Sequence, residues 1–176
     1  MAKKSQNHWN EIKVELGKRS NAVDIVKELY ELSDQNKYFL EARFLDFTIN
    51  TIEPYKKIIV KALNPDPFKN EPIFIDKAQK AVEDYKKSTN DHNTSMELAF
   101  LFLNEAINFC EEYGYREEDI ECALQEVYDI VLDILKEIPE EYDKYYRKMK
   151  DFEGKIEEIT GYDVDSTVDD IKHNKS

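Results

Sequence analysis

The sequence predicts an all-α protein, and three observations support this prediction. Only four glycines occur in 176 residues, so tight turns should be few and the regular elements long. Helix-favouring Glu, Lys, Ala and Leu are abundant, and apolar residues recur at intervals of three and four without a period-two strand pattern. We expect a single domain over residues 1–160, built of about seven to eight helices arranged as antiparallel hairpins or as a short solenoid. A polar C-terminal tail that can fray should follow over residues 161–176.

Four helices are expected in the first part of the chain, each delimited by a capping residue or by proline. Their approximate ranges are 6–17, 21–32, 33–53 and 54–63. Ser33 is a candidate N-cap, and Pro54 suits the first turn of a helix. Three prolines within residues 64–72 then require a loop, because proline cannot continue a helix.

Four more helices are expected after this loop. Their approximate ranges are 74–88, 96–114, 117–138 and 139–160. The segment "LAFLFL" (98–103) is apolar all round, which is typical of a helix buried on most sides. Gly114 is a candidate C-cap for that helix, and Pro139 separates the last two.

The net charge of −13 is concentrated in one segment. Residues 111–143 hold thirteen acidic side chains against Arg116 and Lys136. Because nonspecific nucleic-acid binding depends on Lys and Arg that neutralise phosphates, this balance argues against direct binding to DNA or RNA. A basic partner, a bound cation or solubility alone would each account for the acids.

Four of these acids form a stripe along the helix predicted at residues 117–138. They are Glu126, Asp129, Asp133 and Glu137, opposite an apolar seam that runs from Ile120 to Ile138. Like charges at this spacing cost a few tenths of a kcal/mol per pair. A basic partner, or Lys and Arg from the following helix, would offset that cost. The alternative is a solvated helix face without a partner.

The helix after Pro139 carries an aromatic series at the spacing of one helical face. Its members are Tyr142, Tyr145, Tyr146, Met149 and Phe152. Core packing is the simplest interpretation. However, the adjacent Tyr145 and Tyr146 cannot both point inward, and an exposed tyrosine beside Arg147 has the composition of an interface hot spot. The predicted interaction residues are therefore Glu126, Asp129, Asp133, Glu137, Tyr142, Tyr145, Tyr146 and Arg147.

No catalytic residue, cofactor or metal site is predicted. Metal sites in bundles pair Glu-x-x-His motifs on inward faces, whereas the three histidines are scattered and the acidic stripe should point outward. Residues 163–174 resemble a calcium loop, but Val168 replaces the required glycine and Asn174 the required glutamate. Cys110 and Cys122 read as reduced thiols. No apolar leader or membrane-spanning run is visible, so we expect a cytoplasmic protein.

Two stretches resemble an uncharacterised bacterial family of small all-helical proteins. They are "DIVKELYELSDQNKYFLEARF" (24–44) and "DYKKSTNDHNTSMELAFLFLNEAINFCEEYG" (84–114). In that family an aromatic and glycine-rich segment with an acid lies near the C-terminus, to which "ITGYDVDS" (159–166) corresponds loosely. The resemblance implies a bacterial, cytoplasmic, all-α protein and no particular chemistry.

Three functions follow from these features. The leading hypothesis is a non-enzymatic cytoplasmic protein that binds an unidentified, basic protein partner or a second copy of itself, through the hairpin at residues 117–152. The second hypothesis is an acidic inhibitor that mimics nucleic acid and occupies the groove of a DNA- or RNA-binding protein. The third is a metal-dependent enzyme whose site is assembled from scattered carboxylates. No membrane partner is expected.

Overall fold

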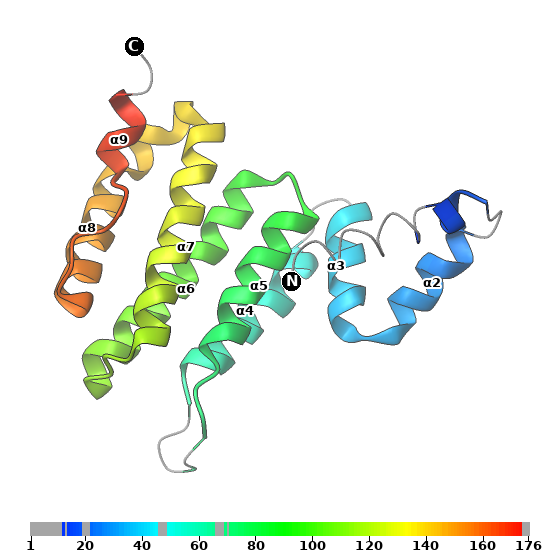
Figure 1. Ribbon diagram of the computed structural model, residues 1–176, viewed down its shortest axis with the longest axis horizontal. Coiled ribbons are helices and arrows are strands. Elements are labelled where there is room, and N and C mark those ends of the chain that lie inside the picture. Colours follow the sequence, from blue (N-terminus) through cyan, green and yellow to red (C-terminus); the bar gives the residue numbers. More distant parts are fainter. Residues whose placement is uncertain are drawn as a thin grey trace. The chain divides into compact units, whose positions relative to one another are not determined.

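The computed structural model describes residues 12, 14–18, 22–45, 49–65, 69 and 71–173. Every regular element within these residues is helical, which confirms the predicted all-α class (Figure 1). The helices are α2 (Ala22–Leu32), α3 (Asp34–Phe44), α4 (Ile49–Leu63), α5 (Ile75–Ser88), α6 (His92–Tyr113), α7 (Glu118–Glu137), the 3₁₀ turn η1 (Pro139–Glu141), α8 (Tyr142–Thr160) and α9 (Val168–His173). The helix predicted over residues 6–17 falls largely outside the described residues.

The chain divides into two compact units, residues 1–41 and residues 42–176, with the boundary inside α3. The sequence predicts one domain over residues 1–160 instead. The difference has a physical cause, because α2 buries none of its residues and α3 buries only Ala42. Val23 and Leu32 of α2 are 82% and 74% exposed.

Helix boundaries follow local capping chemistry. The carboxylate of Asp91 accepts the backbone N–H of Thr94 at 3.1 Å, so α6 begins four residues earlier than apolar periodicity alone predicts. Gly114 closes α6 in the left-handed conformation, with φ of 65°, as expected for a glycine C-cap. Pro54 lies inside α4 rather than at its start, and α4 retains it while burying Ile52 and Tyr55 nearby.

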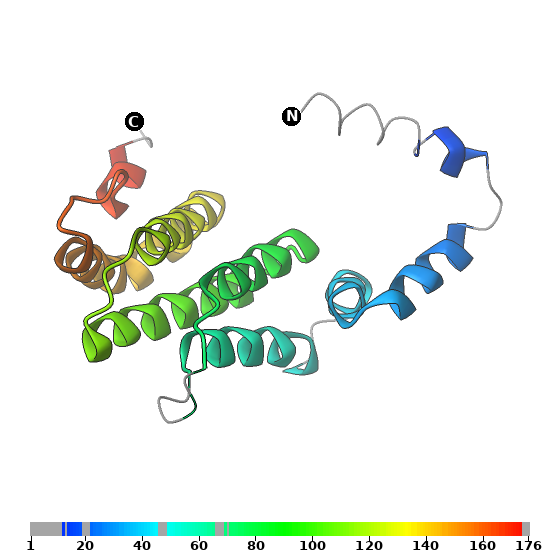
Figure 2. The same ribbon diagram turned by 60° about the horizontal axis from the view of Figure 1, so that its bottom comes forward.

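The second unit consists of helical hairpins stacked side by side in two layers. Each of α4, α6 and α8 forms a hairpin with the helix that follows it, and α6 also contacts both α4 and α8. In the other layer, α7 contacts α5 and α9 (Figures 1 and 2). The core lies between the layers, where α6 and α7 supply most of the fully buried side chains. This arrangement leaves the outward face of α6 between two neighbouring helices.

Within the second unit, α9 (Val168–His173) packs against α7 and α8. Val164, Val168 and Ile171 are buried. Val168 and Ile171 lie three residues apart on α9, and Val164 lies in the irregular stretch that precedes this helix. The C-terminal segment is polar in composition, as predicted, but these three residues anchor it to the helices.

Candidate functional site

A groove of about 580 Å³ runs along the outward face of α6, between α4 and α8. It is lined by residues from these three helices: Lys56, Asn93, Thr94, Glu97, Phe100, Leu101, Asn104, Lys144, Tyr145 and Lys148. Every helix involved belongs to the second unit. The volume is within the range that binding sites in proteins usually have.

The sequence of α6 explains why this face is left open. Half of its side chains are buried against the helices around it, and all of these except Ser95 are apolar. Among the others, Asn93, Glu97 and Asn104 are exposed and Leu101 is half-buried, and these four recur at three- and four-residue intervals. Residues at this spacing share one helical face, so they form the floor of the groove.

Three lysines line the walls of the groove. Lys56 of α4 forms ion pairs with Glu97 at 2.7 Å and with Glu53 at 3.7 Å. Lys144 of α8 forms an ion pair with Glu141 at 2.5 Å, and its ammonium lies 4.6 Å from the centre of the Tyr145 ring. Three of the ten residues that line the groove are therefore basic, and one, Glu97, is acidic.

Lys148 differs from the other two lysines. Its ammonium lies 3.8 Å from the centre of the Phe100 ring, and none of the described carboxylates is within ion-pair distance of it. The side chain is open to the groove, but partial burial against α6 lowers the pKa of its ammonium. Lys148 thus presents a cation that lies over an aromatic face and is not paired with an acid of the described residues.

The predicted acidic stripe lies on the outer surface of α7, where its members differ in exposure. Glu126 is exposed and accepts a hydrogen bond from the side-chain amide of Gln79. Asp129 is half-buried and accepts one from Gln125 at 3.3 Å. Burial, together with the negative charge of Asp133, raises the pKa of Asp129.

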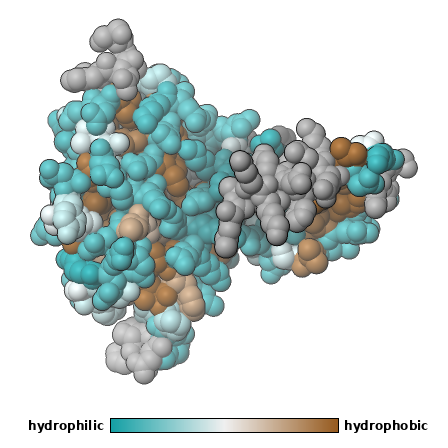
Figure 3. Space-filling view, viewed as in Figure 1, coloured by the Kyte–Doolittle hydropathy of each residue, from teal (hydrophilic) through white to brown (hydrophobic). Residues whose placement is uncertain are grey.

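The other two acids of the stripe have basic neighbours. Asp133 forms an ion pair with Lys136 of the same helix at 2.9 Å, and Nδ1 of His92 lies 3.3 Å from the carboxylate of Glu137. We expected Lys or Arg of α8 to offset the negative charge of the stripe, but these basic neighbours belong to α7 and α6. The surrounding face of α5 and α7 is largely hydrophilic, with hydrophobic residues in small separate groups (Figure 3). Whether the stripe binds a partner stays a prediction.

The aromatic series of α8 is mostly part of the core. Tyr142, Met149 and Phe152 are buried, which agrees with the core-packing interpretation. Tyr145 is half-buried, packs 5.5 Å from the Phe100 ring and forms part of the groove wall. Of the predicted interaction residues, it is therefore the one that the structure brings into the groove.

The remaining two predicted residues of α8 have different surroundings. The hydroxyl of Tyr146 donates a hydrogen bond to Asp169 of α9 at 3.0 Å, so this tyrosine helps to hold the C-terminal segment. Arg147 is exposed.

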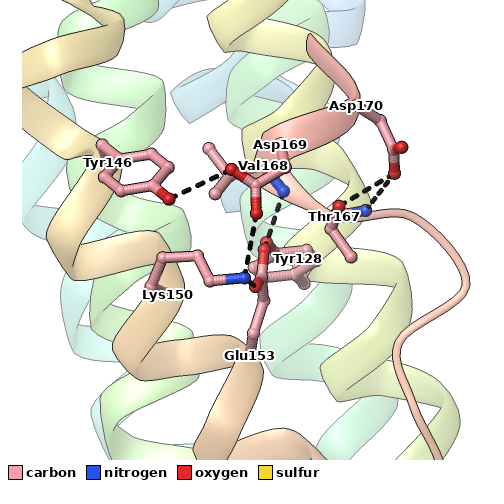
Figure 4. A network of polar contacts seen from close by, with 8 residues as sticks. All are labelled: Tyr128, Tyr146, Lys150, Glu153, Thr167, Val168, Asp169 and Asp170. Atoms are coloured by element: carbon pink, nitrogen blue, oxygen red, sulfur yellow. Dashed lines mark hydrogen bonds and ion pairs between the residues drawn. The ribbon is translucent and has the colours of Figure 1, made fainter. Parts of the chain in front are cut away.

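A buried carboxylate, which the sequence reasoning missed, joins three helices (Figure 4). Glu153 of α8 is only 3% exposed. One of its oxygens accepts the hydroxyl of Tyr128 from α7 and, at 2.7 Å, the backbone N–H of Val168 at the start of α9. The other oxygen forms an ion pair with Lys150. Both oxygens are engaged by the protein's own donors, so the carboxylate clamps α9 to α7 and α8.

The same network continues to the surface. Lys150 also contacts Asp169 at 3.2 Å, and its two carboxylate partners raise its pKa. Burial and the neighbouring carboxylate raise the pKa of the Tyr128 hydroxyl, so this group keeps its proton and donates a hydrogen bond to Glu153. A signal for the network is present in the sequence, since Tyr128 and Glu153 interrupt apolar faces at helical spacing.

The two cysteines are free thiols in different environments. Cys110 is buried and Cys122 exposed. Burial raises the pKa of Cys110 to about 11, which suppresses the reactive thiolate.

Other classes of site are not visible in the part of the chain that the structure describes. Within it, no group of three or more His, Cys, Asp or Glu residues is placed to hold a metal ion. None of the helices described is both long enough and apolar enough to cross a membrane.

Comparisons with protein-family models, with curated proteins and with solved structures found no match to this chain. The resemblance to a bacterial family of helical proteins therefore stays a prediction.

Proposed function

We propose that the protein is non-enzymatic and acts by holding an elongated segment of a partner protein in the groove along α6. The observation that carries this proposal is the shape of the groove. Its floor residues run from Asn93 to Asn104, which corresponds to roughly 16 Å along the helix axis at 1.5 Å per residue. A hollow of three helical turns between two walls matches a peptide segment better than a compact molecule.

The composition of the groove also favours a protein partner. Leu101 and the aromatic ring of Tyr145 supply apolar contact area, while Asn93 and Asn104 can exchange hydrogen bonds at the rim. Protein interfaces commonly combine an apolar centre that contains aromatic residues with a polar rim. The hairpin at residues 117–152 contributes to this surface through Tyr145, and the acidic stripe of α7 remains a separate predicted contact.

The proposal can be tested by selecting peptides from a displayed random library on the immobilised full-length protein. The selected peptides are then measured against two matched variants, Asn104→Trp and Asn108→Trp. Both asparagines are exposed on α6, but only Asn104 lines the groove, so only the first variant should obstruct it.

We expect the selected peptides to bind the Asn104→Trp variant at least about tenfold more weakly, a loss of roughly 1.4 kcal/mol, and to bind Asn108→Trp like the wild type. Circular dichroism of both variants checks that the fold is kept. Peptides that bind both variants equally, or a selection that enriches none, would overturn the proposal.

A further inference from the structure

We propose that the occupant of the groove is an acidic amphipathic helix, whose carboxylate binds the ammonium of Lys148 while its apolar stripe covers Leu101 and Tyr145. This inference rests on the proposed function and adds to it the chemistry and conformation of the partner. It follows from the backbone of the groove, from the distribution of charge on its walls and from the surroundings of Lys148.

The backbone of the groove favours a helix over an extended strand. A peptide that binds as a strand needs a free sheet edge, with backbone donors and acceptors to continue the ladder. The groove walls and floor are α4, α6 and α8, whose backbone groups are hydrogen-bonded within each helix except at the ends. A helix satisfies its own backbone and can pack its side chains between two neighbours at the usual spacing of about 8–10 Å.

The walls favour acidic flanks on that helix. Lys144 and Lys148 lie one turn apart on α8, and Lys56 faces the groove from α4. An amphipathic helix with acids on both sides of its apolar stripe would place one row of carboxylates near each wall. Glu97 is the groove's own acid, and it is already paired with Lys56.

Of the three lysines, Lys148 is the one at which an incoming carboxylate gains the most binding free energy. Lys56 and Lys144 already contact acids of the protein, so a new partner there must compete. Lys148 lies over Phe100 without an acid among the described residues. A carboxylate that reaches it forms a charge-assisted hydrogen bond at an ammonium that the protein has already partly desolvated.

The inference is tested with fluorescein-labelled peptides of about 15 residues, which is about four helical turns. The first peptide is built from Leu, Ala and Glu, with Leu in one helical stripe and Glu on both flanks. Its first twin has Lys in place of every Glu, and its second twin keeps the acids but has a central Pro that breaks the helix. Binding to the full chain is measured by fluorescence anisotropy at about 0.15 M salt, where long-range attraction is largely screened.

We expect the acidic helix to bind at least about tenfold more tightly than either twin. The net charge of −13 predicts the reverse order for the two charged peptides, because a nonspecific attraction would favour the basic one. The order of the two affinities therefore decides between the groove and the overall charge.

Three variants locate the interaction. Lys148→Glu should weaken binding of the acidic peptide at least about tenfold, whereas Arg147→Glu, the same charge change at an exposed neighbour outside the groove, should have little effect. Lys148→Met keeps an apolar stem over Phe100 but removes the cation, so it should lose most of the same affinity. Thermal unfolding of each variant checks the fold.

Two results would overturn the inference, and they are distinct from failure of the proposed function. The first is equal or tighter binding of the basic or proline-containing twin, and the second is equal loss in the Lys148→Glu and Arg147→Glu variants. If library peptides blocked by Asn104→Trp prove basic or non-helical, the groove is still a protein-binding site but its occupant is not an acidic helix. If no library peptide depends on the groove, the proposed function fails as well.

Discussion

Replacement of Glu153 with Ala is the most informative test of how the second unit is held together. The substitution removes the acceptor of the Tyr128 hydroxyl and of the Val168 N–H, and one of the two acids that contact Lys150. Each of the two buried donors that lose their acceptor costs about 1–3 kcal/mol. The lost ion pair adds at most about 1 kcal/mol, because the side chain of Lys150 is 41% exposed and keeps its contact with Asp169. We expect a loss in the free energy of unfolding of about 4 kcal/mol, a large fraction of the 5–15 kcal/mol typical of proteins.

The assay is thermal and urea unfolding followed by circular dichroism, combined with hydrogen exchange of residues 161–171. A loss of this size should lower the melting temperature by roughly 10 °C at 2–4 °C per kcal/mol, and the amides of α9 should exchange faster because their anchor is gone. Glu158→Ala is the matched control, since Glu158 is an exposed acid on the same helix. Tyr128→Phe removes a single donor to the carboxylate and should cost about 1.5–3 kcal/mol.

The contribution of Lys150 makes part of this effect depend on pH. Its folded-state pKa is raised by Glu153 and Asp169, so the folded chain holds this proton more tightly than the unfolded chain does. The resulting stabilisation is complete below the ordinary lysine pKa of about 10.4 and is lost as pH rises through the folded-state value. The part of the difference between wild type and Glu153→Ala that comes from Lys150 should therefore be constant near neutral pH and shrink in alkaline solution. A loss below about 1 kcal/mol with unchanged exchange of α9 would refute the clamp.

Three further predictions concern single residues of the second unit. Asp129→Asn should raise the free energy of unfolding by roughly 0.5 kcal/mol at neutral pH, a small value because solvent screens this half-buried group. Because burial raises the folded-state pKa of Asp129, this gain should disappear as pH falls below about 4. A gain that persists at low pH would contradict burial of the charge as its cause. Cys122 should react rapidly with a thiol reagent in the native protein, and Cys110 should react only on unfolding, because Cys110 is buried and has a pKa of about 11. Equal reaction rates of the two thiols in the native protein would contradict the burial of Cys110. Gly154→Ala inside α8 should raise the free energy of unfolding by about 0.5–1 kcal/mol, whereas Gly161→Ala should lower it by about 1 kcal/mol. An added Cβ meets no neighbouring atom at either position, and of the two only Gly161 has a positive φ, of 74°. If urea unfolding shows that both variants change the free energy of unfolding in the same direction, the backbone explanation is refuted.

Much of the local structure could be predicted because its causes lie close together in the sequence. The apolar seam of α7, the burial of "LAFLFL" and the left-handed cap at Gly114 all follow from periodicity and glycine chemistry. Burial was predicted wrongly where a few apolar residues lie among many polar ones. In the C-terminal segment, Val164, Val168 and Ile171 are buried, but the acids around them suggested a solvated tail.

The candidate groove was less predictable, because it depends on which helices become neighbours. Tyr145 was predicted as a contact residue from its place beside Tyr146, and it does line the groove. Lys148 was not among the predicted interaction residues. Its significance comes from Phe100 on another helix, and no spacing within α8 points to that ring.

The sequence by itself determined that this chain is helical, where most helices begin and end, and which faces of α6 and α7 turn inward. These features depend on backbone propensity and on contacts three or four residues apart, which a linear sequence displays directly. Only the tertiary structure decided that Lys56 and Lys148 face the same groove and that Glu153 joins Tyr128 to Val168. Those pairs lie on different helices, and their meeting depends on side-chain packing and loop geometry summed over the whole unit, which periodicity alone does not encode.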